Sequence, residues 1–239
     1  MKTDGRTHGN HVLIKLDPEN DSVQLKSGLK LFIDTTYEVE KHITVIGEVM
    51  ALPSKLHYSG LPNKGMPWKI NMELQVGDKV FMYYLAVSNA FRKETFNAII
   101  EDDARYVFIK YQSIFAAIRD GRLFPINGYV LVEPSEDPDW LSLKERLAKT
   151  GLSLAKLKTF TNTDVNYGVV RYVGKPVLEY VDKYSDDGVD IKVGDTVVTR
   201  RITDIPLEYE MHQKADGGKK YWRLQRKSIL AVLKNEVVI

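Results

Sequence analysis

Apolar residues in this chain come in short runs that are rich in β-branched and aromatic side chains and that end at turn-forming residues. The clearest runs in the first half lie at 11–16, 43–52, 79–85 and 106–111. Short runs of this composition favour strands over helices. A cluster of glycine, proline and asparagine such as 59–67 is typical of a surface loop. The pattern therefore predicts an all-β fold built from short strands.

The same order of motifs occurs twice along the chain. The pairs are Val-Leu-Ile at 12–14 and Val-Leu-Val at 130–132, Lys-Ser-Gly-Leu at 26–29 and Lys-Thr-Gly-Leu at 149–152, Ile-Gly-Glu-Val at 46–49 and Tyr-Gly-Val-Val at 167–170, Val-Gly-Asp at 76–78 and 193–195, and Ser-Ile at 113–114 and 228–229. The first, fourth and fifth pairs are separated by 118, 117 and 115 residues. This period is longer than the roughly 20–50 residues of solenoid repeats, so it predicts duplication of a whole domain. The expected domains are 1–121 and 122–239.

The repeated Val-Gly-Asp motif predicts a turn that leads into a strand. Gly77 and Gly194 can adopt a positive φ, and the side chains of Asp78 and Asp195 can accept hydrogen bonds from exposed backbone amides.

A polar loop in the first half carries an apolar segment. Leu29, Leu31 and Ile33 alternate with Lys30 and Phe32, which suits an extended conformation. The sequences on both sides are polar and turn-prone. Such apolar residues either fold back onto their own domain or bind in the groove of a partner. Both interpretations stay open from the residues alone.

The ordered set of motifs resembles the chaperonin-10 (co-chaperonin) family, in two copies that cover most of residues 9–118 and 126–233. The resemblance implies two tandem GroES-like partial β-barrels. It also implies a protein that assembles into a homo-oligomeric ring, caps a chaperonin ring of the Hsp60/GroEL type and assists ATP-dependent protein folding. Members dock through a mobile loop whose aliphatic tripeptide binds an apolar groove. The residues that this implies for docking are Leu29, Lys30, Leu31, Phe32, Ile33, Leu152, Ser153 and Leu154.

Three features of the sequence depart from the family pattern. The central residue of each tripeptide is polar, Lys30 in the first and Ser153 in the second. The second loop contains an insert, 137–148, that predicts a short helix: Ser142 and Glu145 fit a capping box, and Gly151 fits a helix stop. The apolar face of this helix would hold Trp140, Leu143 and Leu147. Finally, a chain of paired domains contributes an even number of domains to a closed ring.

Composition and charge narrow the function further. The 34 basic and 32 acidic residues give a net charge of +2, which does not favour a nucleic-acid partner. The chain has no cysteine, no long apolar run and no secretory signal at Met1–Gly5, so we expect a cytoplasmic protein without a membrane partner. No histidine spacing fits a metal site and no phosphate-binding glycine motif occurs. We therefore expect no cofactor, no metal and no enzymatic activity.

Two alternatives remain beside the co-chaperonin. The first is a structural or assembly protein that kept the fold without binding a chaperonin. The second is a nucleic-acid-binding β-barrel that stacks bases on exposed aromatic residues. The residues available for stacking would be Tyr83, Tyr84, Tyr221 and Trp222.

Overall fold

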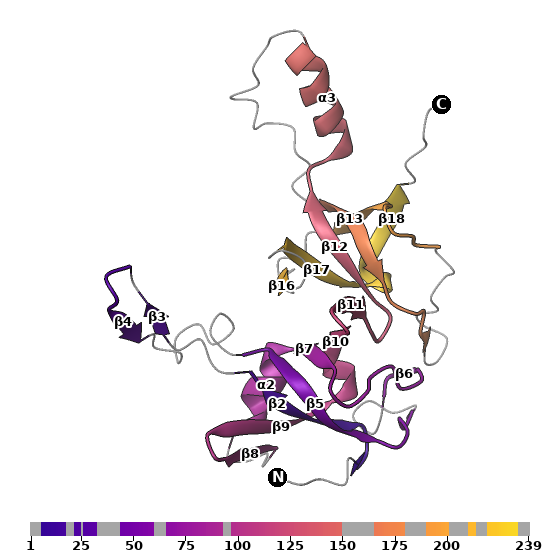
Figure 1. Cartoon of the computed structure of the whole chain (residues 1–239). Helices are drawn as coiled ribbons and strands as arrows, with labels where there is room; N and C mark the ends of the chain where they lie inside the picture. The colour runs from indigo at the N-terminus through magenta and orange to yellow at the C-terminus, as the bar shows by residue number, and fades with distance from the viewer. Residues whose placement is uncertain are drawn as a thin grey trace. The chain divides into compact units, whose positions relative to one another are not determined.

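The computed structural model describes residues 6–17, 22–24, 26–32, 44–59, 66–92, 97–149, 165–179, 190–200, 210–213 and 219–233. The described chain is mostly β, as predicted, and it divides into two compact units (Figure 1). Unit 1 comprises residues 1–127 and 176–185, and unit 2 comprises residues 128–175 and 186–239. These limits differ from the expected division at residue 121 in two respects. Strand β11 belongs to unit 1, and so does a short segment from the second half of the sequence.

Unit 1 is built on an eight-stranded sheet. Its strands follow the order β11-β10-β7-β5-β2-β9-β8, with β1 paired to β5. The bounds are β1 Arg6–Thr7, β2 His11–Leu16, β5 Ile46–Pro53, β7 Lys79–Met82, β8 Ala98–Glu101, β9 Ala104–Lys110, β10 Ile114–Arg119 and β11 Arg122–Pro125. A 3-10 turn, η1 (Tyr111–Ser113), separates β9 from β10. Two-stranded sheets join β6 (Trp68–Lys69) to β14 (Leu178–Glu179), and β3 (Ser22–Gln24) to β4 (Lys30–Phe32).

Unit 2 is built on a six-stranded sheet in which β18, β15, β13, β12, β17 and β16 follow one another. Their bounds are β12 Tyr129–Ser135, β13 Val165–Val173, β15 Thr196–Arg200, β16 Glu210–Gln213, β17 Lys219–Gln225 and β18 Ile229–Leu233. A 3-10 turn, η3 (Arg226–Ser228), precedes β18 as η1 precedes β10. Strand for strand, this order repeats β10-β7-β5-β2-β9-β8 of unit 1.

The two sheets also share their irregularities. The pairing of β2 with β5 shifts register between Leu13 and Ile14, and the pairing of β12 with β13 shifts between Leu131 and Val132. These two positions are 118 residues apart, which is the separation of the first pair of sequence motifs. Because a β-bulge is a specific feature of one register, its repetition shows that the sequence motifs occupy the same places in the two sheets.

Gly47 and Gly168 hold equivalent positions in β5 and β13. A Cβ atom on Gly47 would lie 2.5 Å from the backbone oxygen of Lys15, and one on Gly168 would lie 2.9 Å from the backbone oxygen of Glu133. Neither distance leaves room for a side chain. The glycine of each Gly-x-Val motif is therefore required by the close approach of the neighbouring strand.

The two Val-Gly-Asp turns have the structure that the sequence predicts. Gly77 has φ of +91° and Gly194 has φ of +98°. The side chain of Asp78 accepts the backbone N–H of Gln75 at 2.7 Å, and that of Asp195 accepts the backbone N–H of residue 192 at 2.8 Å. Each turn is tied to the central strand of its sheet, since the glycine N–H donates to the oxygen of Val49 in unit 1 and of Val170 in unit 2, both at 2.8 Å.

The strand predicted over 79–85 is wrong in its second half. β7 ends at Met82, and residues Tyr84–Ala90 form the helix α2. The backbone N–H of Tyr83 donates to the oxygen of Ser113 at 2.8 Å, and the helix begins immediately after that bond. Val87 and Ala90, one helical turn apart, are buried. The apolar run continued across the strand end because both elements bury side chains in the same core.

Each sheet buries its own core. In unit 1 the core includes residues from β2, β5, β7, β9, β10 and α2, and in unit 2 a smaller core is formed by Val130, Val132, Val170, Ile191, Val197 and Leu224. Within the described parts of the chain, no helix is long and apolar enough to cross a membrane.

Candidate partner-docking site

The predicted docking segment of the first half lies in a β-hairpin. β3 pairs antiparallel with β4, with Val23 opposite Leu31 and Gln24 opposite Lys30. The backbone of Lys30, Leu31 and Phe32 is therefore extended, as the alternating pattern predicts. Among the described strands, β3 and β4 pair only with each other and not with the eight-stranded sheet of unit 1.

The turn of this hairpin presents an apolar residue to solvent. Gly28 adopts φ of +84°, and a Cβ atom placed on it would have no atom within 4 Å. Leu29 follows it and is 58% exposed, and Lys26 and Ser27 are exposed as well. Burying a leucine side chain releases about 1.5–3 kcal/mol, so an exposed leucine beside a polar turn is available for binding. More than half of the surface of Leu29 is thus open to solvent.

The remaining predicted docking residues are described in part or not at all. The backbone of Lys30, Leu31 and Phe32 is described, whereas Ile33 and the tripeptide Leu152-Ser153-Leu154 lie outside the described residues. Docking through these residues stays a prediction.

The insert of the second loop contains the predicted helix. This helix, α3, spans Pro138–Lys149 and follows β12 along the chain (Figure 1). It begins four residues before Ser142, so the predicted capping box is wrong. Proline is favoured at the first helical position because it has no N–H to satisfy, and the Asp137 oxygen accepts the N–H of Leu141 at 2.9 Å.

The three leucines of α3 are at least partly open to solvent, and the side chain of Trp140 lies outside the described part of the helix. Leu141 and Leu143 are exposed, and Leu147 is half-buried. Leu141 and Leu143 are two positions apart and so lie on different sides of the helix. The insert consequently exposes single apolar side chains on more than one side of the helix.

A largely buried ion pair joins two neighbouring parts of the eight-stranded sheet of unit 1. The carboxylate of Asp78 accepts two hydrogen bonds from Arg119, from Nε at 2.8 Å and from Nη2 at 2.7 Å. The side chain of Asp78 is 2% exposed and that of Arg119 is 32% exposed. The hydrogen bond to Asp78 raises the pKa of Arg119, so the guanidinium stays charged. Sequence analysis identified the aspartate through its motif but not the arginine.

A second set of polar contacts lies next to this pair. Glu73 accepts the backbone N–H of Asn127 at 2.9 Å, and the backbone N–H of Glu73 donates to the Tyr111 hydroxyl at 3.0 Å. Burial, followed by the charge of Glu73, raises the pKa of Tyr111 well above its ordinary value. The amide of Asn127 donates to the backbone oxygens of Tyr111 and Ile114, and its oxygen accepts the indole N–H of Trp68. These contacts fix the chain where β11 ends. Sequence analysis did not identify these contacts, because they join residues that lie far apart in the sequence.

The described residues also bear on metal binding and on nucleic-acid binding. Within the described residues, no group of three or more His, Asp or Glu side chains is placed to hold a metal ion. Tyr221 is buried and lies edge-on to Tyr172, with ring centroids 5.7 Å apart. The rings of Tyr83 and Tyr84 lie edge-on to each other at 5.1 Å. Tyr221 therefore cannot stack a base, although it is one of the four aromatic residues that the nucleic-acid alternative needs.

The chain was compared with known proteins. No protein-family model matches it, and no curated protein matches it.

Proposed function

We propose that this protein is a co-chaperonin: it docks on a chaperonin ring of the Hsp60/GroEL type through apolar loop residues and caps the ring during ATP-dependent folding. In this proposal each β unit is a GroES-like partial barrel. The observation that carries the proposal is the hairpin of β3 and β4, which pairs only with itself among the described strands and exposes Leu29 at its turn.

The hairpin suits this role energetically. A segment that is already extended loses less conformational entropy on binding than a disordered one. Leu29 would add about 1.5–3 kcal/mol if its side chain were fully buried in a groove. That corresponds to weak binding by a single loop. Useful affinity then requires several loops to engage together, because linked binding events strengthen one another.

A free sheet edge supports the assembly of several chains. In unit 1 the outer edge of β10 is covered by β11, with Ala117 opposite Phe124 and Ile118 opposite Leu123. In unit 2 the equivalent strand, β18, is the last in its sheet, and no described strand pairs with its outer edge. Phe115 of β10 is 4% exposed, whereas the equivalent Leu230 of β18 is 54% exposed. An exposed apolar edge is a template for pairing with another chain.

We propose that a second copy of the chain covers the edge of β18, and that repetition of this contact builds a homo-oligomeric ring. A contact between two different surfaces of the same protein forms a ring when the rotation between copies closes. Within one chain, β11 already covers the edge of β10. Only one new edge contact per chain is then needed.

The two halves would dock differently. The first half offers the β3–β4 hairpin with Leu29 at its turn, and the second offers α3 with Leu141 and Leu143 exposed. An extended apolar segment and a helix are two distinct ways of filling an apolar groove.

The docking test uses a purified chaperonin with ATP, with ADP and without nucleotide. The wild-type chain should co-migrate with the chaperonin on a sizing column in a nucleotide-dependent manner, and Leu29→Ser should reduce the bound fraction several-fold. Ile100→Ser, which changes a 70% exposed residue of β8, is the matched control and should bind like wild type. The absence of a complex under every nucleotide condition would refute the proposal.

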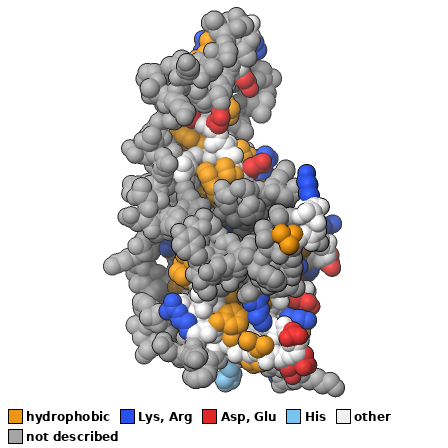
Figure 2. Space-filling view, turned by 90° about the vertical axis from the view of Figure 1, so that its left-hand side faces the viewer, with side chains coloured by type: hydrophobic (Ala, Val, Ile, Leu, Met, Phe, Trp, Pro, Cys, Tyr) orange, Lys and Arg blue, Asp and Glu red, His pale blue; other side chains and the backbone are white. Residues whose placement is uncertain are grey.

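The same experiment separates the alternatives. A structural protein would assemble alone and show no response to chaperonin. A nucleic-acid binder would bind single-stranded DNA or RNA with an affinity that falls steeply as salt is added. Basic and acidic side chains occur together on the face of the molecule in Figure 2, so a strongly basic surface is not evident there.

A further inference from the structure

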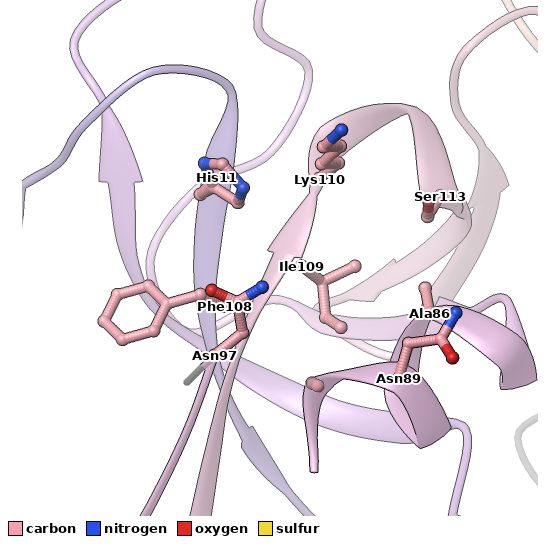
Figure 3. Close-up of a pocket in the computed structure, with 9 residues that line it drawn as sticks. His11, Ala86, Asn89, Asn97, Phe108, Ile109, Lys110 and Ser113 are labelled. Carbon is pink, nitrogen blue, oxygen red and sulfur yellow. The ribbon is translucent and has the colours of Figure 1, made fainter. Parts of the chain in front are cut away.

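A pocket in unit 1 lies between two strands of the sheet and the helix α2 (Figure 3). Its volume is about 260 Å³. Ala86 and Asn89 of α2 lie on one side, and Lys110 and Ser113 lie at the end of β9 and in the turn that follows (Figure 3). Ile109, which is buried, lies between them. The pocket therefore has an apolar floor and a polar rim.

The polar rim is made of hydrogen-bond donors. The ammonium group of Lys110 and the imidazole ring of His11 can each donate a hydrogen bond. Asn89, Asn97 and Ser113 add amide and hydroxyl groups. None of the nine residues that line the pocket is acidic. Among the described residues that line the pocket, there is thus no carboxylate to neutralise Lys110.

His11 and Lys110 form a cross-strand pair, since they lie opposite each other in the register of β2 and β9. The equivalent pair in unit 2 is Tyr129 and Gln225 of β12 and β17. There the two side chains satisfy each other, because the amide of Gln225 donates to the Tyr129 hydroxyl at 3.2 Å. His11 and Lys110 make no such bond: among the described contacts, neither side chain has a hydrogen bond or an ion pair.

The equivalent pairs differ in their hydrogen bonding: Tyr129 and Gln225 bond to each other, whereas His11 and Lys110 do not. In unit 2 the ring of Tyr129 is also covered by the guanidinium of Arg223, 5.5 Å from the ring centre. In unit 1 the same place in the sheet carries two nitrogen donors beside a pocket. Two potentially positive groups directly opposite each other destabilise a sheet unless a negative group lies nearby.

We propose that this pocket binds a small organic anion whose phosphate or carboxylate group contacts His11 and Lys110 and whose apolar part lies over Ile109 and Ala90. An oxyanion would satisfy both donors at once, and a charge-assisted hydrogen bond to lysine is stronger than a neutral one. The buried side chains of Ile109 and Ala90 at the floor favour a ligand with an apolar portion over a bare ion. The site is independent of the proposed docking on a chaperonin.

The probe is phenyl phosphate, titrated into the full-length protein and followed by amide chemical shifts in NMR spectra. Saturable shifts should appear at residues of α2 and at the end of β9, with a dissociation constant in the range of about 0.1–1 mM for a ligand of this size. Benzyl alcohol, a neutral molecule of similar shape, should bind at least tenfold more weakly. Inorganic phosphate should bind more weakly than phenyl phosphate because it lacks the apolar part.

The decisive variant carries His11→Tyr together with Lys110→Gln, which copies the pair that unit 2 already accommodates. It should fold, as shown by an unchanged spectrum away from the pocket, and bind phenyl phosphate about tenfold more weakly. Lys15→Gln, which removes one charge from an exposed position on β2, is the matched control and should bind as wild type does. The proposal is overturned if the double variant keeps wild-type affinity, if benzyl alcohol binds equally well, or if no saturable shift appears at these residues.

Discussion

The ion pair between Asp78 and Arg119 allows a quantitative test of the packing of unit 1. Replacing Arg119 by Met keeps most of the length of the side chain but removes its charge and both hydrogen bonds to Asp78. The carboxylate of Asp78 would then keep its hydrogen bond from the backbone N–H of Gln75, at 2.7 Å. Removing one member of a buried ion pair destabilises a protein by about 3–5 kcal/mol, because it leaves an uncompensated buried charge.

Partial exposure to solvent reduces the loss of stability expected for this pair. The side chain of Arg119 is 32% exposed, so water screens part of the attraction. We expect Arg119→Met to lower the free energy of unfolding of unit 1 by about 2–3 kcal/mol. The matched control is Lys79→Met, which removes the cation of the pair between Lys79 and Asp17 on the same sheet. That pair has a similar distance, 2.8 Å, but both side chains are exposed. The expected change is below about 1 kcal/mol.

Urea denaturation monitored by tryptophan fluorescence measures the free energy of unfolding of both variants. Trp68 is the single tryptophan of unit 1, so a background with Trp140→Phe and Trp222→Phe makes it the reporter. The reasoning is refuted if the Arg119→Met and Lys79→Met variants lose the same free energy of unfolding. A loss in Arg119→Met that disappears at high salt would also contradict it, since a buried pair is screened less than an exposed one.

Three further changes test other features of the fold. Thr199→Val should leave stability unchanged or raise it by about 1 kcal/mol in thermal denaturation, because the buried hydroxyl has no hydrogen-bond partner among the described residues; a clear loss would show that the hydroxyl is satisfied. Gly47→Ala and Gly168→Ala should each destabilise their unit by at least about 1–3 kcal/mol in urea, since the new methyl group meets backbone oxygen; a neutral effect in either would contradict the close approach. Tyr111 has its pKa raised by burial, so the unfolded chain ionises this residue from about pH 10 while the folded chain does not. The protonated hydroxyl of Tyr111 therefore contributes fully to the free energy of unfolding below pH 10, and this contribution declines by about 1.4 kcal/mol per pH unit above it. In denaturation curves, the stability advantage of wild type over Tyr111→Phe should shrink above pH 10. A constant difference would contradict this.

The sequence predicted those features that depend on local pattern. The strands of the first half follow from short apolar runs, and the two Val-Gly-Asp turns have the positive φ and the aspartate cap that their residues require. A helix in the insert was predicted from capping signals and an apolar face, and the structure has one over Pro138–Lys149. Its start was misplaced because Pro138 can begin a helix without a polar capping residue at 142.

Features that depend on distant partners were not predictable in this way. Glu73, Tyr111 and Asn127 contact one another across 38 and 54 residues of sequence, and no periodic pattern reports such contacts. The pairing of β14 with β6 joins residues more than a hundred positions apart, with Leu178 opposite Lys69. The helix α2 was hidden by an apolar run shared with β7. Local propensity does not distinguish the end of a strand from the start of a helix when both bury apolar residues.

The duplication was predictable from the sequence, whereas the differences between the two sheets were not. The repeated motifs indicated two related domains, and the shared strand order and bulges place these motifs equivalently in the two sheets. What differs between the sheets lies outside the motifs. The edge of β10 is covered by β11, whereas no described strand covers the edge of β18. The pair His11–Lys110 stands where unit 2 has Tyr129–Gln225. These differences are where we locate the assembly contact and the anion site.

Hydrogen exchange of the hairpin in the presence of a chaperonin tests the proposed function most directly. The protein is mixed with a chaperonin of the Hsp60/GroEL type and ATP, and exchange is followed by mass spectrometry in peptides that cover residues 22–32 and, as an internal reference, β8 and β9. The co-chaperonin account predicts slower exchange in 22–32 with chaperonin and nucleotide together, an effect lost in Leu29→Ser and retained in Ile100→Ser. Unchanged exchange in this segment under every nucleotide condition would contradict it.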